Sequence, residues 1–135
     1  MNQFIGTGNL GAEPLAKDII IGGEPRRVCE LRVFFDQYAP DGNGGVKQVG
    51  GFWQNVEIWR EALIDHCMAH LRKGARVVVV AQMRGDQWEH KGTGEPRYGT
   101  HLVADEVGIT LGRIESVRFR PKREVDTAQP EDRAS

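Results

Sequence analysis

The sequence predicts an all-β protein: a five-stranded Greek-key barrel with one helix between its third and fourth strands. Three observations lead to this prediction. Several short segments alternate apolar and polar residues, which is the pattern of half-buried strands. A single segment has helical spacing, and clusters of turn-forming residues separate the segments. A doubly wound sheet would need repeated helical crossovers, so this order of elements favours a barrel.

The first half of the chain contains two of the expected strands. Gln3–Leu10 is expected to form the first, because the breakers Gly11 and Pro14 follow its β-forming residues. The segment 26–35 is expected to form the second, since its apolar and polar residues alternate. Between them, the isoleucine run 19–21 ends at a Gly-Gly turn and is not counted as a strand of its own.

The second half supplies the helix and the other three strands. Residues 36–51 hold Asp-Gly, Asn-Gly and Gly-Gly pairs, so a flexible loop or hairpin tip is expected there. The third strand is expected over 52–59, and the helix over 60–72, where apolar residues recur at helical spacing. The last two strands are expected over 77–88 and 97–107, on either side of a Gly-rich turn.

Length and charge indicate one domain with a short tail. The 135 residues have room for a single hydrophobic core, which is expected within 1–112. Residues 113–135 are expected to be a partly disordered tail, with a net charge of +4 over 113–123 and −3 over 124–135. The net charge of −1 for the whole chain gives no general attraction to nucleic acid, so any such site must be a local basic patch.

Cysteine content and hydropathy predict a cytoplasmic protein. Cys29 and Cys67 form no CxxC pair, so neither a disulfide framework nor a zinc knuckle is expected. No apolar run reaches the roughly 18 residues that a membrane span needs, and the N-terminus lacks a secretory pattern. We therefore expect a reduced compartment and no membrane contact.

Two motifs suggest other chemistries, but their contexts argue against them. Residues 6–11 match the Gly-x-Gly-x-x-Gly pattern of dinucleotide sites, which requires a helix directly behind it. Residues 12–18 are too short for that helix and contain a proline. His66, Cys67 and His70 have zinc-like spacing, yet Cys67 falls in the apolar stripe and no third ligand is evident. No catalytic centre, cofactor or metal is expected.

Aromatic residues close to basic ones are the most informative feature. In the expected strand 52–59, Trp53 and Trp59 share the face that also holds Asn55 and Glu57, so both indoles are expected at the surface. Exposed rings stack on unpaired bases, and neighbouring cations bind phosphates. The candidate DNA-binding residues are Trp53, Trp59, Trp88, Tyr38, Arg60, Lys73, Arg84, Lys91 and Arg97.

An ordered set of motifs also runs from residue 1 to about residue 111. The set comprises Asn2 with Gly8-Asn9-Leu10-Gly11 and Pro14, then Trp53, Val56 and Trp59, then Leu71-Arg72-Lys73-Gly74 and Val77, then Gln82-Met83-Arg84, Trp88, Gly94 and Arg97-Tyr98. Together these motifs resemble the bacterial single-stranded DNA-binding protein family. The resemblance implies an OB fold, a homotetramer, and DNA wrapped over Trp53, Trp59 and Trp88. The sequence departs from the family pattern at Asp86 and Gln87, where the family tends to be basic.

The resemblance also implies a cellular role. It predicts binding of single-stranded DNA with little sequence preference, protecting it during replication, recombination, repair or mobile-element transfer. Family members commonly end in an acidic tip closing on Pro-Phe, which docks replication and repair enzymes. Here no aromatic residue follows Phe119, so recruitment by that route is not expected. Two alternatives stay open: an OB-fold interaction or oligomerisation module with weak nucleic-acid binding, and an RNA-directed protein, since stacking does not distinguish the sugars.

Overall fold

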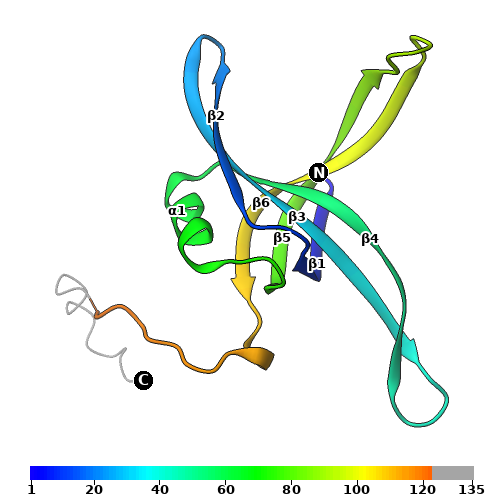
Figure 1. Ribbon diagram of the computed structural model, residues 1–135, viewed down its shortest axis with the longest axis vertical. Coiled ribbons are helices and arrows are strands. Elements are labelled where there is room, and N and C mark those ends of the chain that lie inside the picture. Colours follow the sequence, from blue (N-terminus) through cyan, green and yellow to red (C-terminus); the bar gives the residue numbers. More distant parts are fainter. Residues whose placement is uncertain (123–135) are drawn as a thin grey trace.

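The computed structural model describes residues 1–122 and shows a closed ring of strands from which three hairpin arms project (Figure 1). The strands are β1 (Gln3–Leu10), β2 (Leu15–Ile21), β3 (Glu24–Pro40), β4 (Val46–Ile58), β5 (Arg76–Glu89) and β6 (Pro96–Ile109). Within this range one helix, α1 (Glu61–His70), links β4 to β5, and a 3-10 turn, η1 (Leu111–Arg113), follows β6. The sheet order is β1-β5-β6-β4-β3-β2, and a further pairing of β1 with β3 closes the barrel.

The predicted fold class is confirmed, but the sheet contains one more strand than expected. Residues 15–21 form β2, which pairs antiparallel with the first part of β3 from Leu15↔Glu30 to Ile21↔Glu24. Residues 11–14 separate β2 from β1. The isoleucine run 19–21 is therefore part of β2 and belongs to the hairpin arm that β2 forms with β3. The remaining expected strands and the helix are present at the expected places, with ends that differ by a few residues.

The expected flexible loop at 36–51 is mostly paired, so that prediction is wrong about its length. Both β3 and β4 extend into it and form the long β3–β4 arm. Only the tip is a turn, which the Asp41 carboxylate holds by accepting hydrogen bonds from the backbone N–H groups of Asn43 and Gly45, at 2.7 and 3.1 Å. The glycine content predicted the turn correctly, but the residues on its two sides pair with each other as the ends of β3 and β4.

The core lies inside the ring, where inward-facing residues of the strands meet α1. In β4 the predicted alternation is confirmed, because Val56 and Ile58 are fully buried. Phe4, Phe35 and Phe52 pack on one another, with ring centroids 4.9 Å apart for Phe4 and Phe35 and 5.7 Å apart for Phe35 and Phe52. The other buried residues of the core are Leu10, Cys29, Leu31, Val33, Leu63, Ile64, Cys67, Leu71, Val77, Val79, Ala81 and Leu102.

The Gly-x-Gly-x-x-Gly run lies in and just after β1, and β2 follows it. A Cβ atom at Gly8 would collide with the carbonyl oxygen of Phe34, because β1 and β3 pair there to close the barrel. At Gly11 a Cβ atom would lie 2.6 Å from the ring of Trp53. These glycines therefore let β1 approach β3 and leave space for an indole.

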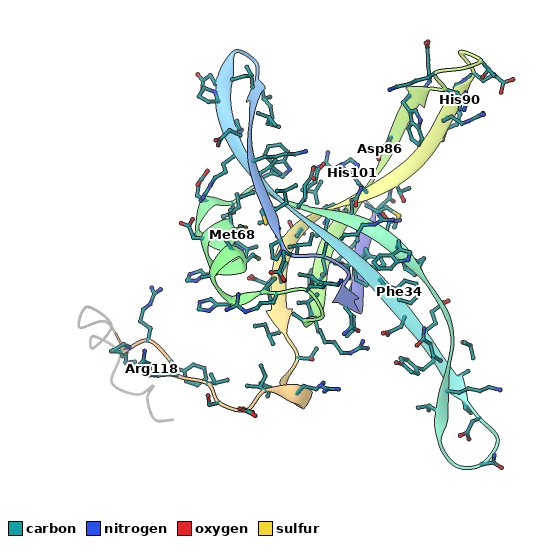
Figure 2. All side chains as sticks on the ribbon, in the orientation of Figure 1. Phe34, Met68, Asp86, His90, His101 and Arg118 are labelled. Atoms are coloured by element: carbon teal, nitrogen blue, oxygen red, sulfur yellow. The ribbon has the colours of Figure 1, made fainter. Side chains whose placement is uncertain are left out.

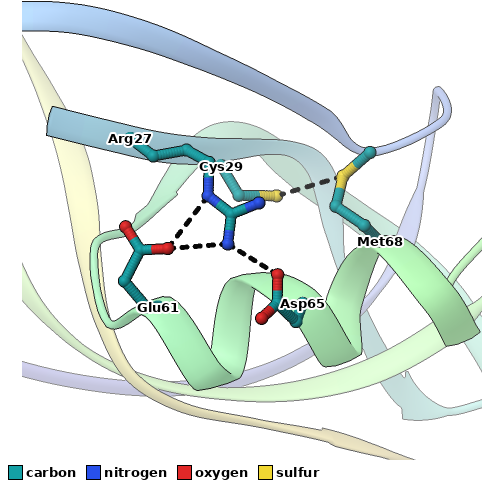
Figure 3. A network of polar contacts seen from close by, with 5 residues as sticks. All are labelled: Arg27, Cys29, Glu61, Asp65 and Met68. Carbon is teal, nitrogen blue, oxygen red and sulfur yellow. Dashed lines mark hydrogen bonds and ion pairs between the residues drawn. The ribbon is translucent and has the colours of Figure 1, made fainter.

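Helix α1 is held on the barrel by its buried side and by ion pairs to β3 (Figure 3). The Arg27 guanidinium donates hydrogen bonds to the carboxylates of Glu61 at 2.7 Å and Asp65 at 2.6 Å. Cys67 lies in the core, as its place in the apolar stripe predicts, and burial raises the pKa of its thiol to about 11. In residues 1–122 no helix has the length and apolar character needed to cross a membrane.

The helix is shorter than the predicted 60–72, because the flanking residues Arg60 and Leu71 have extended backbones. His66 and His70 stack on its exposed side with ring centroids 6.0 Å apart. Cys67 lies between the two histidines in the sequence, but its side chain is buried in the core. His66, Cys67 and His70 line one small pocket, but within residues 1–122 no group of three His, Cys, Asp or Glu side chains is arranged to hold a metal ion.

A nearly buried ion pair ties β5 to β3. The Arg76 guanidinium binds both carboxylate oxygens of Asp36, at 2.7 and 3.0 Å, and the Asp36 side chain is only 8% exposed. Arg76 also donates to Asn9 Oδ1 at 2.6 Å, so β1 joins the same network. The Arg76 guanidinium lowers the pKa of Asp36, and this means that the folded state favours the ionised carboxylate.

We expect Asp36→Asn to lower the free energy of unfolding by about 2 kcal/mol at neutral pH, because it removes a charge-assisted bond and leaves Arg76 without its carboxylate. Since the pKa of Asp36 is lower in the folded state, this stabilisation exists above pH of about 4 and is lost as the pH falls through the folded-state pKa. Urea unfolding of both proteins across that range measures the difference. Asp18→Asn, on β2, is the control, and a gap that persists at the lowest pH would contradict the explanation.

Candidate nucleic-acid interface

The outer face of β3, β4, β6 and β5 carries several exposed aromatic side chains. In β4 the alternation that buries Val56 and Ile58 turns Trp53 outward, and Trp59 follows directly after the strand. Trp53 is 47% exposed and lies opposite Phe34 of β3 in the strand register. The predicted surface exposure is confirmed for Trp53, whereas Trp59 is only partly exposed.

Trp53 is fixed in place by contacts on several sides. The Phe34 ring lies 5.1 Å away, centroid to centroid, and the Arg32 guanidinium carbon lies 5.3 Å from the Trp53 ring centroid. Arg32 in turn donates a hydrogen bond to Asn55 Oδ1 at 3.1 Å. Below the ring, Gly11 leaves room for the indole. The result is a rigid, half-exposed aromatic surface with a cation beside it, which is what base stacking needs.

Trp88 forms a second exposed aromatic surface on the β5–β6 arm. Its side chain is 51% exposed, and its indole lies over Gly99, where a Cβ atom would come within 3.2 Å of the ring. Arg97 stands directly across the strand pair from Trp88, although it also forms an ion pair with Glu95 at 3.3 Å. Tyr98, which the candidate set omits, is 71% exposed on the same arm.

Trp59 differs from the other two tryptophans because its ring is partly covered. Its indole N–H donates to Glu57 Oε1 at 3.1 Å, and the Arg26 guanidinium carbon lies 5.6 Å from its ring centroid. Trp59 is only partly exposed. Arg26 would have to move before a base could stack on that side of the ring.

An unexpected feature lies between the tryptophans: a histidine held between two carboxylates. His101 Nδ1 lies 2.7 Å from Asp86 Oδ1, and His101 Nε2 lies 3.6 Å from Glu57 Oε1. Figure 2 shows His101 and Asp86 at the root of the β5–β6 arm, with Phe34 on β3 at the other side of the face. We call Glu57, His101 and Asp86 the acidic bridge. It spans β4, β6 and β5, in the middle of the aromatic face.

The candidate basic residues are spread over several parts of the surface. Arg84 lies directly across from His101 on β5, and Lys91 lies in the turn of the β5–β6 arm. Arg60 is engaged at the start of α1, where it donates to the carbonyl oxygen of Asp105 at 3.0 Å. Tyr38, which is 53% exposed, lies on the β3–β4 arm.

Lys73 lies apart from the others, near the start of β5 and at the opposite end of that strand from Trp88. There it lines a cleft of about 340 Å³. Other basic residues that line this cleft are His70, Arg72, Arg76 and Arg113. Of the basic segment 113–123, Arg113 thus contributes to a positive surface on the barrel, and residue 123 lies outside the described range.

Sequence reasoning missed Phe34, Arg32, Arg26 and the acidic bridge as parts of this face. Phe34 could have been predicted as part of this face, because strict alternation from Leu31 and Val33 places it on the outer side of β3. The pairing of Arg26 with Trp59, and of His101 with two carboxylates, depends on how separate strands are aligned. A single sequence carries no direct signal of that alignment.

Comparison with known proteins identifies the family and supports the fold. Residues 1–110 match the model of the single-strand binding protein family. Among solved structures, a small single-stranded DNA-binding protein from Streptomyces coelicolor superposes with a TM-score of 0.67 and 20% identity, covering 84% of this chain and 99% of that one. An SSB from Plasmodium falciparum, solved in complex with single-stranded DNA, gives a TM-score of 0.63 and 22% identity, covering 82% of this chain and 95% of that one.

Proposed function

This chain belongs to the single-strand binding protein family, and we propose on that basis that DNA runs over the outer face of β4, β6 and β5 and stacks on Trp53 and Trp88. The activity itself follows from the family: the protein binds single-stranded DNA. The path is our inference. The observation that carries it is that the two most exposed indoles lie on this one face, each beside an arginine.

The basic residues fit a phosphate path along the rim of this face. Arg32 beside Trp53, Arg84 in the middle and Arg97 beside Trp88 follow the aromatic surfaces from β3 to the β5–β6 arm. Stacking is tolerant of sequence because every base has a π face, so such a path suits a general binder. We place this activity in the cytoplasm, where it would protect single strands during replication, recombination, repair or mobile-element transfer.

Intrinsic tryptophan fluorescence tests the function directly. We expect quenching when a pyrimidine single strand is added and much weaker change with duplex DNA, because only unpaired bases are free to stack on the indoles. Titrations at two salt concentrations report phosphate contacts, each of which adds about 0.7 to the slope of log affinity against log salt for single strands. Unchanged fluorescence with every single strand tested would contradict the proposal.

We also propose that the protein is a homotetramer. β3 pairs with β1 only at Gly8, Asn9 and Leu10, so one edge of β1 before that point has no strand beside it within residues 1–122. On the outer face next to this edge, Ile5 is 65% exposed and lies opposite Val80 in the register with β5. An open strand edge beside an apolar surface is the usual setting of contact between identical subunits.

Light scattering is expected to give the mass of a tetramer, and Ile5→Asp is expected to give a smaller species, because it places a charge in the proposed contact. Ile20→Asp is the matched control, since Ile20 is 69% exposed on β2, away from this edge. A monomeric wild-type protein at micromolar concentration, or equal effects of the two substitutions, would refute this proposal.

A further inference from the structure

The acidic bridge lies in the middle of the face on which we place the DNA, at a position where a binder of phosphates would be expected to carry positive charge. Glu57 accepts the indole N–H of Trp59, and Asp86 stands two residues before Trp88 on the same strand. A base that passes between these two tryptophans therefore passes the acidic bridge. The exposed indoles of this face indicate a ligand that stacks, namely an unpaired base.

The bridge offers hydrogen-bond acceptors to such a base. Glu57 uses Oε1 for Trp59, and Asp86 uses Oδ1 for His101. Within residues 1–122 their second oxygens accept no hydrogen bond, and the Asp86 side chain is 41% exposed. Ionised carboxylates accept hydrogen bonds and do not donate them. His101 adds no free donor, because its Nδ1 faces Asp86 and its Nε2 faces Glu57.

Bases differ in what they present to such acceptors. Cytosine carries an exocyclic amino group at C4, which donates to Glu or Asp side chains. Uracil and thymine carry a carbonyl oxygen at the same position, which would face a carboxylate oxygen without a proton between them. Cytosine and uracil are otherwise nearly equal in size and shape, so stacking alone distinguishes them less than this edge does.

We propose that the acidic bridge gives the protein a preference for bases with an exocyclic amino group, so that cytosine-containing strands bind more tightly than uracil-containing ones. The proposal rests on the proposed DNA path over this face. It also accounts for Asp86, a residue that opposes phosphate binding. The nearby Arg84 would contact the DNA phosphates, while Asp86 and Glu57 would accept hydrogen bonds from the edge of the base.

The test compares oligo(dC) and oligo(dU) of equal length, labelled with a fluorophore, at neutral pH, where cytosine is uncharged. For the wild type we expect oligo(dC) to bind about five-fold more tightly, at the low end of the discrimination of a base-edge contact. Asp86→Asn and Glu57→Gln each replace one oxygen acceptor by an amide donor, so the ratio should fall toward one in both. Asp18→Asn, with the same loss of charge on β2, should keep the wild-type ratio.

Each outcome decides the matter. A dC to dU ratio that falls in both bridge variants and stays in Asp18→Asn supports the proposal. A wild-type ratio near one overturns it, and so do bridge variants that bind both strands more tightly with an unchanged ratio, since the carboxylates would then act only through charge. Tight binding of oligo(dU) by the wild type shows that the proposed function holds even if the preference fails. Failure to bind either strand would overturn both.

Discussion

Alanine at Trp88 is expected to weaken single-stranded DNA binding by about 5- to 150-fold, which corresponds to about 1–3 kcal/mol for one lost base stack. Trp88 is the cleanest position to test, because its indole lies over Gly99 on a projecting arm and is absent from the hydrophobic core. Its loss should leave the barrel stable. The affinity is measured by the anisotropy of a labelled strand, and the stability by urea unfolding.

The other two tryptophans provide graded comparisons. Trp53→Ala should have a similar effect on affinity, but it also removes contacts with Phe34 and Arg32, so some loss of stability is expected as well. Trp59→Ala should cost less affinity, because Arg26 covers part of that ring. A folded Trp88→Ala protein that binds like the wild type would show that the DNA takes another path. A larger loss at Trp59 than at Trp88 would move the path toward the start of α1.

Gly8→Ala is expected to destabilise the protein by about 3 kcal/mol, near the upper end for overpacked sites. The new methyl group would meet the backbone carbonyl of Phe34, and a backbone atom cannot move aside as a side chain can. The only relief is separation of β1 from β3, which opens the barrel. Urea unfolding measures the loss.

Gly108→Ala on β6 is the matched control for Gly8→Ala. A Cβ atom there meets nothing within 4 Å, and Gly108 has no positive φ. Its effect should stay within about 0.5 kcal/mol, as for most surface substitutions. Equal stabilities of the two variants would mean that β1 and β3 tolerate a wider separation than the closed barrel implies.

The fold could be predicted where one strand alone determines the pattern. The alternation from Phe52 to Ile58 predicted the inward side of β4, on which Val56 and Ile58 are buried. The helix was predictable because the apolar residues within that one segment recur at helical spacing. The ordered β3–β4 arm was not, because its Gly-rich residues carry no apolar pattern, and only their pairing with β3 makes them a strand.

The candidate site divides in a similar way. Exposure of Trp53 followed from the polar residues that share its face, and the structure agrees. The sequence could not show that Trp59 lies under Arg26, or that His101 lies between Asp86 and Glu57. Those pairs join residues from different strands, so they depend on the register that the whole barrel adopts. For the same reason the sequence could not show that Lys73 lies near the start of β5, at the opposite end of that strand from Trp88.

The pairing of β1 also determines when the chain can fold during synthesis. Gln3 pairs with Gln82 and Asn9 with Arg76, so β1 cannot complete its pairing until β5 has been made. Meanwhile β2, β3 and β4 can form their hairpins, since these contacts are local and form quickly. Until β5 emerges, β1 presents Phe4, Ile5 and an unpaired strand edge to neighbouring nascent chains. Pausing of translation while β5 is still inside the ribosome should therefore increase aggregation of this protein, whereas pausing after β5 has emerged should not.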